Sequence, residues 1–167
     1  KERIEHVEWR DAQASLEYVW HYYVEPPDFR DIARSGLEHL LLLAESNAAQ
    51  EKLAGMQNED DRHDFEVRIK ARLAQIKDAP ILDRGDCIRH FRRVVKDINP
   101  ETVNLPEELV VSEIMRGALE PLDDFTTMIW PQAVSDFNKH TRGDFIGVGI
   151  SIIKNELDEI EVVTPLE

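Results

Sequence analysis

The sequence has few glycines, few aromatic residues and one cysteine, and it contains no long apolar run. Its 167 residues include 7 Gly and 1 Cys, and 7% are aromatic. The single cysteine, Cys87, cannot form an internal disulfide, so cysteine usage does not indicate whether the protein works in an oxidising or a reducing compartment. The longest apolar stretch lies near 40–44 and is far too short to span a bilayer, so no transmembrane segment is predicted. No basic segment followed by an apolar one opens this stretch of sequence, so no signal peptide is predicted in it.

Basic residues are also scarce. The chain has 34 Asp and Glu against 20 Lys and Arg, which gives a formal net charge of -14. Proteins that bind nucleic acid or anionic membranes need clustered cations to neutralise phosphates, so we expect no nucleic-acid partner. Apolar residues make up 42% of the chain and charged residues 32%, which is typical of a folded globular protein.

Most of the chain carries apolar residues at helical spacing, three or four apart. Prolines and short polar stretches separate these stripes, and one helix is expected to end at Asn99-Pro100. A short helix plus a turn is expected at 46–57, and a last helix from Trp130-Pro131 to Phe137. The sequence therefore predicts a mainly α fold, a multi-helix bundle. The stripes are Ala12, Leu16, Val19 and Tyr23; Phe29, Ala33, Leu37, Leu40 and Ala44; Phe65, Ile69, Leu73 and Ile76; Ile88, Phe91, Val94, Val95 and Ile98; and Val111, Ile114, Met115, Ala118 and Leu119.

The period changes in the closing stretch, 143–167, which reads GDFIGVGISIIKNELDEIEVVTPLE. Apolar residues alternate there from Val148 to Ile152, and 160–163 reads as a second strand after a turn at 155–159. A lone β-hairpin is marginal in water, so it must either pack on the helices or await further strands, and we favour the second. We therefore expect a helical domain over 1–142 and a hairpin over 143–167.

Few residues in the helical part suggest chemistry. The six histidines do not pair at ligand spacing, so neither a metal site nor a cofactor is predicted. Cys87 and His90 are three apart on a helix, but a thiolate nucleophile also needs an oxyanion hole and an orienting group, so a structural cysteine is favoured. The glycines at 147 and 149 could supply amides that hold a peptide's terminal carboxylate, or could form a bulge at a domain junction. The residues alone leave both open.

Residues 122–167 resemble the carboxy-terminal processing peptidases, or tail-specific proteases. That family carries Leu-Asp, then an aromatic or His with Ser or Thr, an apolar pair, a proline-opened helix, a T-x-G-x-F-x-G-[IV]-G-[IV] run and V-V-x-P. In this chain Trp130 stands at a usually polar position, and Ile146 stands where many relatives have glycine. Upstream, 19–29 and 35–41 resemble the family's N-terminal helical segment. The matching residues are Leu122, Asp123, Phe125, Thr126, Met128, Ile129, Pro131, Thr141, Gly143, Phe145, Gly147, Val148, Gly149, Ile150, Val162, Val163 and Pro165.

The resemblance implies that the hairpin begins a PDZ domain that is incomplete in this sequence. Gly147, Val148, Gly149 and Ile150 would belong to the loop and first strand that capture the C-terminal carboxylate of a substrate. The family's nucleophilic Ser and its Lys base lie in a later domain, and no segment here matches them. The resemblance therefore implies a non-catalytic piece, without catalytic residues, that is inactive on its own.

The same resemblance implies partners and a location. The complete PDZ domain would bind protein or peptide C-termini, and the helical domain would act as a scaffold or form a homodimer. Family proteases mostly work outside the cytoplasm, so a location in the periplasm or cell envelope is expected here. The alternative is a free-standing helical interaction module, in which the hairpin would be a finished element packed on the helices.

Overall fold

The computed structural model describes residues 7–130, Val134, Phe137 and the backbone of 150–154 and 160–165. The chain forms two compact units, Lys1–Gln132 and Ala133–Glu167. The first unit is helical, and the prediction of a mainly α protein is confirmed.

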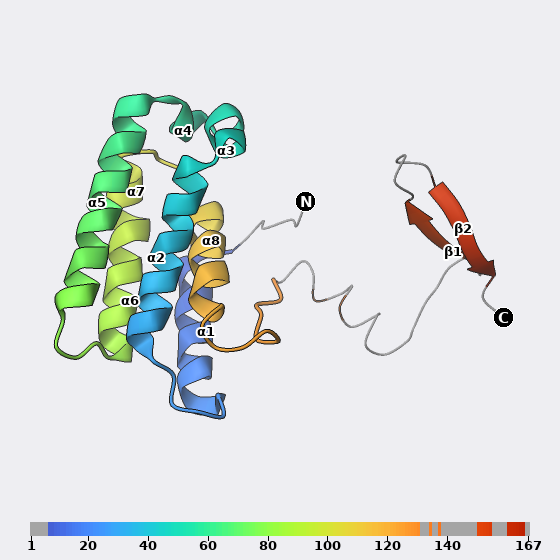
Figure 1. Ribbon diagram of the computed structural model, residues 1–167, viewed down its shortest axis with the longest axis horizontal. Helices are drawn as coiled ribbons and strands as arrows, with labels where there is room; N and C mark the ends of the chain where they lie inside the picture. Colours follow the sequence, from blue (N-terminus) through green and yellow to red (C-terminus); the bar gives the residue numbers. More distant parts are fainter. Residues whose placement is uncertain (1–6, 131–133, 135–136, 138–149, 155–159, 166–167) are drawn as a thin grey trace. The chain divides into compact units, whose positions relative to one another are not determined.

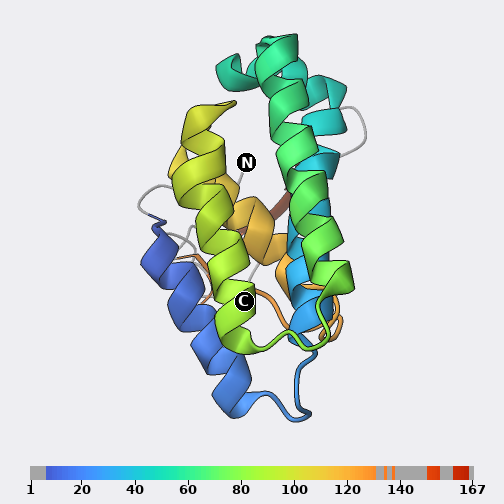
Figure 2. The ribbon, with the colours of Figure 1, turned by 90° about the vertical axis from the view of Figure 1, so that its left-hand side faces the viewer.

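In the first unit, α2 lies at the centre and contacts α8, α5 and α6 (Figure 1). Helices α1 and α6 lie beside each other on the face that Figure 2 turns toward the viewer. The described elements are α1 Trp9–Tyr22, α2 Phe29–Glu45, α3 Asn47–Lys52, α4 Ala54–Gln57, α5 Glu59–Asp78, α6 Arg84–Arg93, the π-helical turn η1 Val94–Ile98, α7 Asn99–Glu101 and α8 Glu107–Leu119.

Short polar side chains fix where the long helices begin. Asp28 accepts hydrogen bonds from the second and third amides of α2, and Asn58 does the same for α5. Asp83 and Asp86 form a reciprocal capping box at the start of α6. Each cap satisfies amides that have no partner within the helix, which is typically worth about 1 kcal/mol.

The predicted apolar stripes form the core. Leu16, Phe65, Phe91 and Ile114, from four different helices, are all fully buried. The crossing of α2 and α8 also requires a glycine: a Cβ added to Gly117 would stand 2.5 Å from the Ser35 carbonyl oxygen. The two backbones therefore approach more closely than any larger residue would allow.

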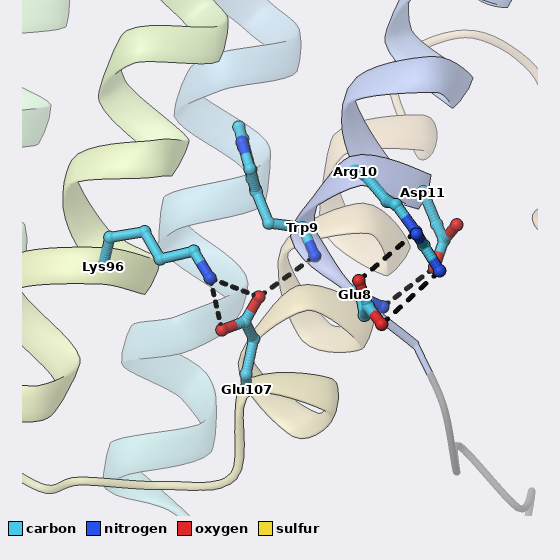
Figure 3. A network of polar contacts seen from close by, with 6 residues as sticks. All are labelled: Glu8, Trp9, Arg10, Asp11, Lys96 and Glu107. Atoms are coloured by element: carbon cyan, nitrogen blue, oxygen red, sulfur yellow. Dashed lines mark hydrogen bonds and ion pairs between the residues drawn. The ribbon is translucent and has the colours of Figure 1, made fainter.

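The starts of α1 and α8 are joined by a polar contact (Figure 3). The Trp9 amide donates to Glu107 Oε1 at 3.1 Å, and Lys96 Nζ lies 2.7 Å from the same oxygen. One carboxylate therefore holds the first turn of α1 and the side of η1 together.

The expected helix end at Asn99-Pro100 is wrong, because the helical backbone continues to Glu101. Val94–Ile98 forms a π-helical turn, and the Asn99 amide donates to the Val94 carbonyl five residues back. Pro100 has no N–H to donate, and it falls where the bonding pattern leaves the π-turn for α7. The expected helix plus turn at 46–57 is two short helices, α3 and α4.

The second unit contains β1 Ile150–Lys154 and β2 Ile160–Pro165, which pair antiparallel. Ser151 pairs with Thr164 and Ile152 with Val162, so Val163 is the extra residue of a bulge. The predicted turn at 155–159 lies outside the described residues, as does most of the helix expected from Trp130 to Phe137.

Candidate functional site

Of the stretch 122–167, the structure describes residues 122–130 in full; they follow α8, and we call them the exit segment. Its first turn is built on Asp123. The amides of Phe125 and Thr126 donate to Asp123 Oδ1 at 2.7 and 2.6 Å, and the Thr126 hydroxyl donates to Oδ2 at 2.6 Å. These donors lower the pKa of Asp123, the Thr126 hydroxyl most of all. The Leu-Asp-x-Phe-Thr pattern therefore specifies one turn, held by an ionised carboxylate.

Tyr23 anchors this turn to the N-terminal helix. Its hydroxyl donates to the Leu122 carbonyl at 2.6 Å across 99 positions of sequence. Partial burial raises the pKa of Tyr23, and the neighbouring Asp123 carboxylate raises it further. The phenol therefore keeps the proton that the contact needs. The sequence predicts Tyr23 as the last residue of an apolar helical stripe, and this bond was not predicted. Its hydroxyl group is the one polar feature that distinguishes Tyr23 from the other members of that stripe.

The end of the exit segment packs against the helices. Met128 Sδ lies 3.7 Å from the Ser15 hydroxyl of α1. Trp130 is only 6% exposed and belongs to the core. Phe125, in contrast, is 92% exposed. The exit segment is thus fixed at its start by polar bonds and at its end by apolar burial.

Two cavities flank the exit segment. One of about 390 Å³ lies between α8 and the segment, and its walls include Ser112, Arg116 and Asp123. The other, of about 360 Å³, is more apolar and lies between α1 and the segment, with walls that include Tyr18 and Met128.

Among their described lining residues, neither cavity pairs a serine with a His or Lys base. The Ser112 hydroxyl donates to the Leu109 carbonyl in its own helix, and no His or Lys is among the described lining residues of its cavity. A serine without a general base is a poor nucleophile. Within the described part of the chain, no three His, Cys, Asp or Glu side chains gather where a metal ion could bind.

Cys87 has the environment of a structural cysteine. Its side chain is fully buried, and burial raises the pKa of the thiol far above its usual range. His90 Nδ1 is buried and has no hydrogen-bond partner among the residues that the structure describes, and burial lowers the pKa of this imidazole. A neutral, inaccessible thiol beside a histidine that does not bond to it is not an activated nucleophile.

The structure does not describe the side chains of the predicted carboxylate-binding residues. Gly147, Val148 and Gly149 lie outside the described residues, and Ile150 is placed only by its backbone, as the first residue of β1. No helix in the described part of the chain is long and apolar enough to cross a membrane. No protein family, curated protein or solved structure matches this chain.

Proposed function

We propose that this chain is the N-terminal, non-catalytic region of a tail-specific serine endopeptidase. The helical unit would act as a scaffold, and the hairpin would be the first part of a PDZ domain that captures substrate C-termini. Gly147, Val148, Gly149 and Ile150 would supply the carboxylate-binding loop and first strand. We also propose a location in the periplasm or cell envelope, following the resemblance.

The observation that supports the scaffold role is the anchoring of the exit segment. Three donors hold Asp123, and a tyrosine from the other end of the unit holds Leu122. A connection whose first residues have one conformation restricts the directions in which the following chain can leave. The residues that do this are among those that carry the resemblance.

The first experiment compares cleavage of an unfolded reporter with an apolar C-terminal tail by two proteins. One is the 167-residue chain, and the other is the chain extended through its downstream coding sequence. We expect cleavage only by the extended protein, with loss of activity when its nucleophilic Ser or base Lys is replaced. Amidation of the reporter's C-terminus should slow cleavage, because a PDZ loop binds the free carboxylate. Cleavage by the 167-residue chain, or none by either protein, would refute the proposal.

Two neighbouring tyrosines give a matched test of the scaffold role. Tyr23 is anchored to Leu122, whereas Tyr22 is 72% exposed. In the extended protein we expect Tyr23→Phe to lower kcat/KM for the tailed reporter several-fold, and Tyr22→Phe to leave it unchanged. Equal values for both variants, with circular dichroism showing both folded, would mean that the anchor does not serve catalysis.

A second candidate, a free-standing helical interaction module, is favoured by exposed apolar residues around the end of α1. The rings of Tyr18 and Tyr22 are in contact, tilted to each other with centroids 4.7 Å apart, and Val24 is almost fully exposed. Exposed apolar patches commonly mark protein contacts, including homodimers. A dimer in sedimentation experiments that Tyr18→Ser/Tyr22→Ser dissociates, together with no proteolysis by the extended protein, would support this function instead.

A further inference from the structure

A group of cations on α5, α6 and η1 stands out on this acidic protein. A cavity of about 360 Å³ is lined by Arg72, Arg89, Arg92, Arg93, Lys96 and Asp97, which we call the basic cleft. Its walls therefore hold five cations and one carboxylate, although the whole chain carries a net charge of -14.

Helical spacing gathers these side chains. Positions 89, 92, 93 and 96 follow the i, i+3, i+4, i+7 pattern that places residues on one helix face. Phe91, Val94 and Val95, which lie between them in sequence, are buried in the core. Arg72 joins the group from α5. The π-turn η1 follows the arginines directly, and single π-turns inside helices are frequent at functional sites.

Part of the positive charge is already neutralised within the chain. Arg89 pairs with Asp86, and Arg93 pairs with Asp97 at 2.9 Å. Lys96 pairs with Glu107, and Figure 3 shows this third pair. Counting these partners, the five cations face three carboxylates.

Two arginines of the basic cleft remain available for a ligand. Neither Arg72 nor Arg92 makes an ion pair with any residue that the structure describes, although Arg72 donates to Gln75 at 3.0 Å. A positive field also acts on the neighbouring His90, since Arg72 and Arg89 both add to the lowering of its pKa.

We propose that the basic cleft binds a short acidic segment of another polypeptide, through carboxylate contacts to Arg72 and Arg92. Guanidinium groups suit this ligand because their planar donors match a carboxylate oxygen pair. The cleft lies outside the exit segment, and the inference does not depend on the proposed protease function.

The short range of electrostatic interactions at physiological salt favours a peptide ligand over a larger polyanion. The Debye length at physiological ionic strength is about 8 Å, so a short segment in the cleft interacts mainly with the local cations. A nucleic acid duplex or an anionic membrane would extend past the cleft and meet the remaining surface of a chain whose net charge is -14. Repulsion there opposes binding of both.

The test measures binding of a fluorescein-labelled oligoglutamate to the whole 167-residue chain by fluorescence anisotropy, with oligoglutamine as the neutral probe. We expect oligoglutamate alone to bind, with affinity falling as salt rises from about 50 to about 500 mM. Arg72→Gln/Arg92→Gln should weaken binding by about tenfold.

The control variant Lys52→Gln/Lys70→Gln makes the same change in net charge at exposed positions outside the cleft. It should change the affinity less than about twofold. Equal weakening by both variants would overturn the proposal, because net charge and not the cleft would then control binding. It would also be overturned by absence of oligoglutamate binding at low salt, or by tighter binding to duplex DNA or to phosphatidylserine vesicles.

Discussion

Helices α8 and α5 are held in the same unit by different forces. Of the 13 residues of α8, eight are buried, among them Ile114 and Gly117. Of the 20 residues of α5, only Phe65, Ile69 and Ile76 are buried. The rest of α5 makes exposed polar contacts, such as the 2.5 Å ion pair from Arg68 to Glu101, which typically contribute less than about 1 kcal/mol. Close apolar packing on several sides therefore specifies the centre of the unit, whereas α5 at its edge is held by one narrow apolar stripe.

The largest expected effect comes from a cavity in α8. Ile114→Ala removes a fully buried side chain and should lower the free energy of unfolding by about 4 kcal/mol. Val67→Ala on α5, where the side chain is 48% exposed, should cost less than about 1 kcal/mol. Urea unfolding of both variants measures the difference. Similar losses would mean that Val67 is packed as tightly as Ile114.

Overpacking the α2–α8 crossing should have the next largest effect. Gly117→Ala places a methyl group 2.5 Å from the Ser35 carbonyl oxygen and should cost about 2–3 kcal/mol. Gly85→Ala in α6 is the matched control, since its Cβ would meet only the ends of the Asp83 and Arg89 side chains. Because one of these contacts is to the capping oxygen of Asp83, the gain in helix propensity is partly offset, and the free energy of unfolding should change by less than about 1 kcal/mol in the same urea titration. If Gly117→Ala left the free energy of unfolding unchanged, α2 and α8 could move apart without loss of stability.

The end of α5 depends on a single guanidinium from the start of α2. Arg30 donates to the carbonyls of Ile76, Lys77 and Ala79 at 2.9, 3.0 and 2.6 Å, at the end of α5, where helix carbonyls lack partners within the helix. Arg30→Met should lower the free energy of unfolding by about 2 kcal/mol. Arg30→Lys should restore only part of it, because an ammonium cannot reach several carbonyls in a fork. If Arg30→Lys had the same stability as the wild type in thermal unfolding, the positive charge alone, and not the fork geometry, would account for the stabilisation.

The smallest effect is a pH dependence at the α5–α6 edge. Burial lowers the pKa of His90, and Arg72 adds to the shift. The folded state then favours neutral imidazole, so this stabilisation is complete above about pH 6.5 and is lost as pH falls from there toward the folded pKa. The Tm of the wild type relative to His90→Gln should therefore decrease between pH 8 and pH 5. A constant difference would mean that His90 does not titrate differently on folding.

The local part of the fold could be predicted from the sequence. Asp28 after two prolines, followed by apolar residues at helical spacing, defines α2 at Phe29, and the stripe through Ile114 defines α8. Such features involve residues within a few positions, whose effects on the backbone are direct.

The missed features depend on residues far apart or on patterns without a sequence signature. Nothing near Tyr23 or Arg30 indicates partners 99 and 46 positions away. The π-turn at Val94–Ile98 has apolar residues at spacings that fit an α-helix equally well. Of the candidate site, the sequence indicated Asp123 and Thr126 through their motif, but the geometry of their turn follows only from the hydrogen bonds.

The anchor between Tyr23 and Leu122 also has a consequence for the order of events during synthesis. Tyr23 is translated first, and the ribosome must add almost a hundred residues before it reaches Leu122, since the two are 99 positions apart. The first helix therefore cannot take its final contacts until the end of the unit has been translated. The second unit follows Gln132 in the chain, so it is translated after the first unit is complete.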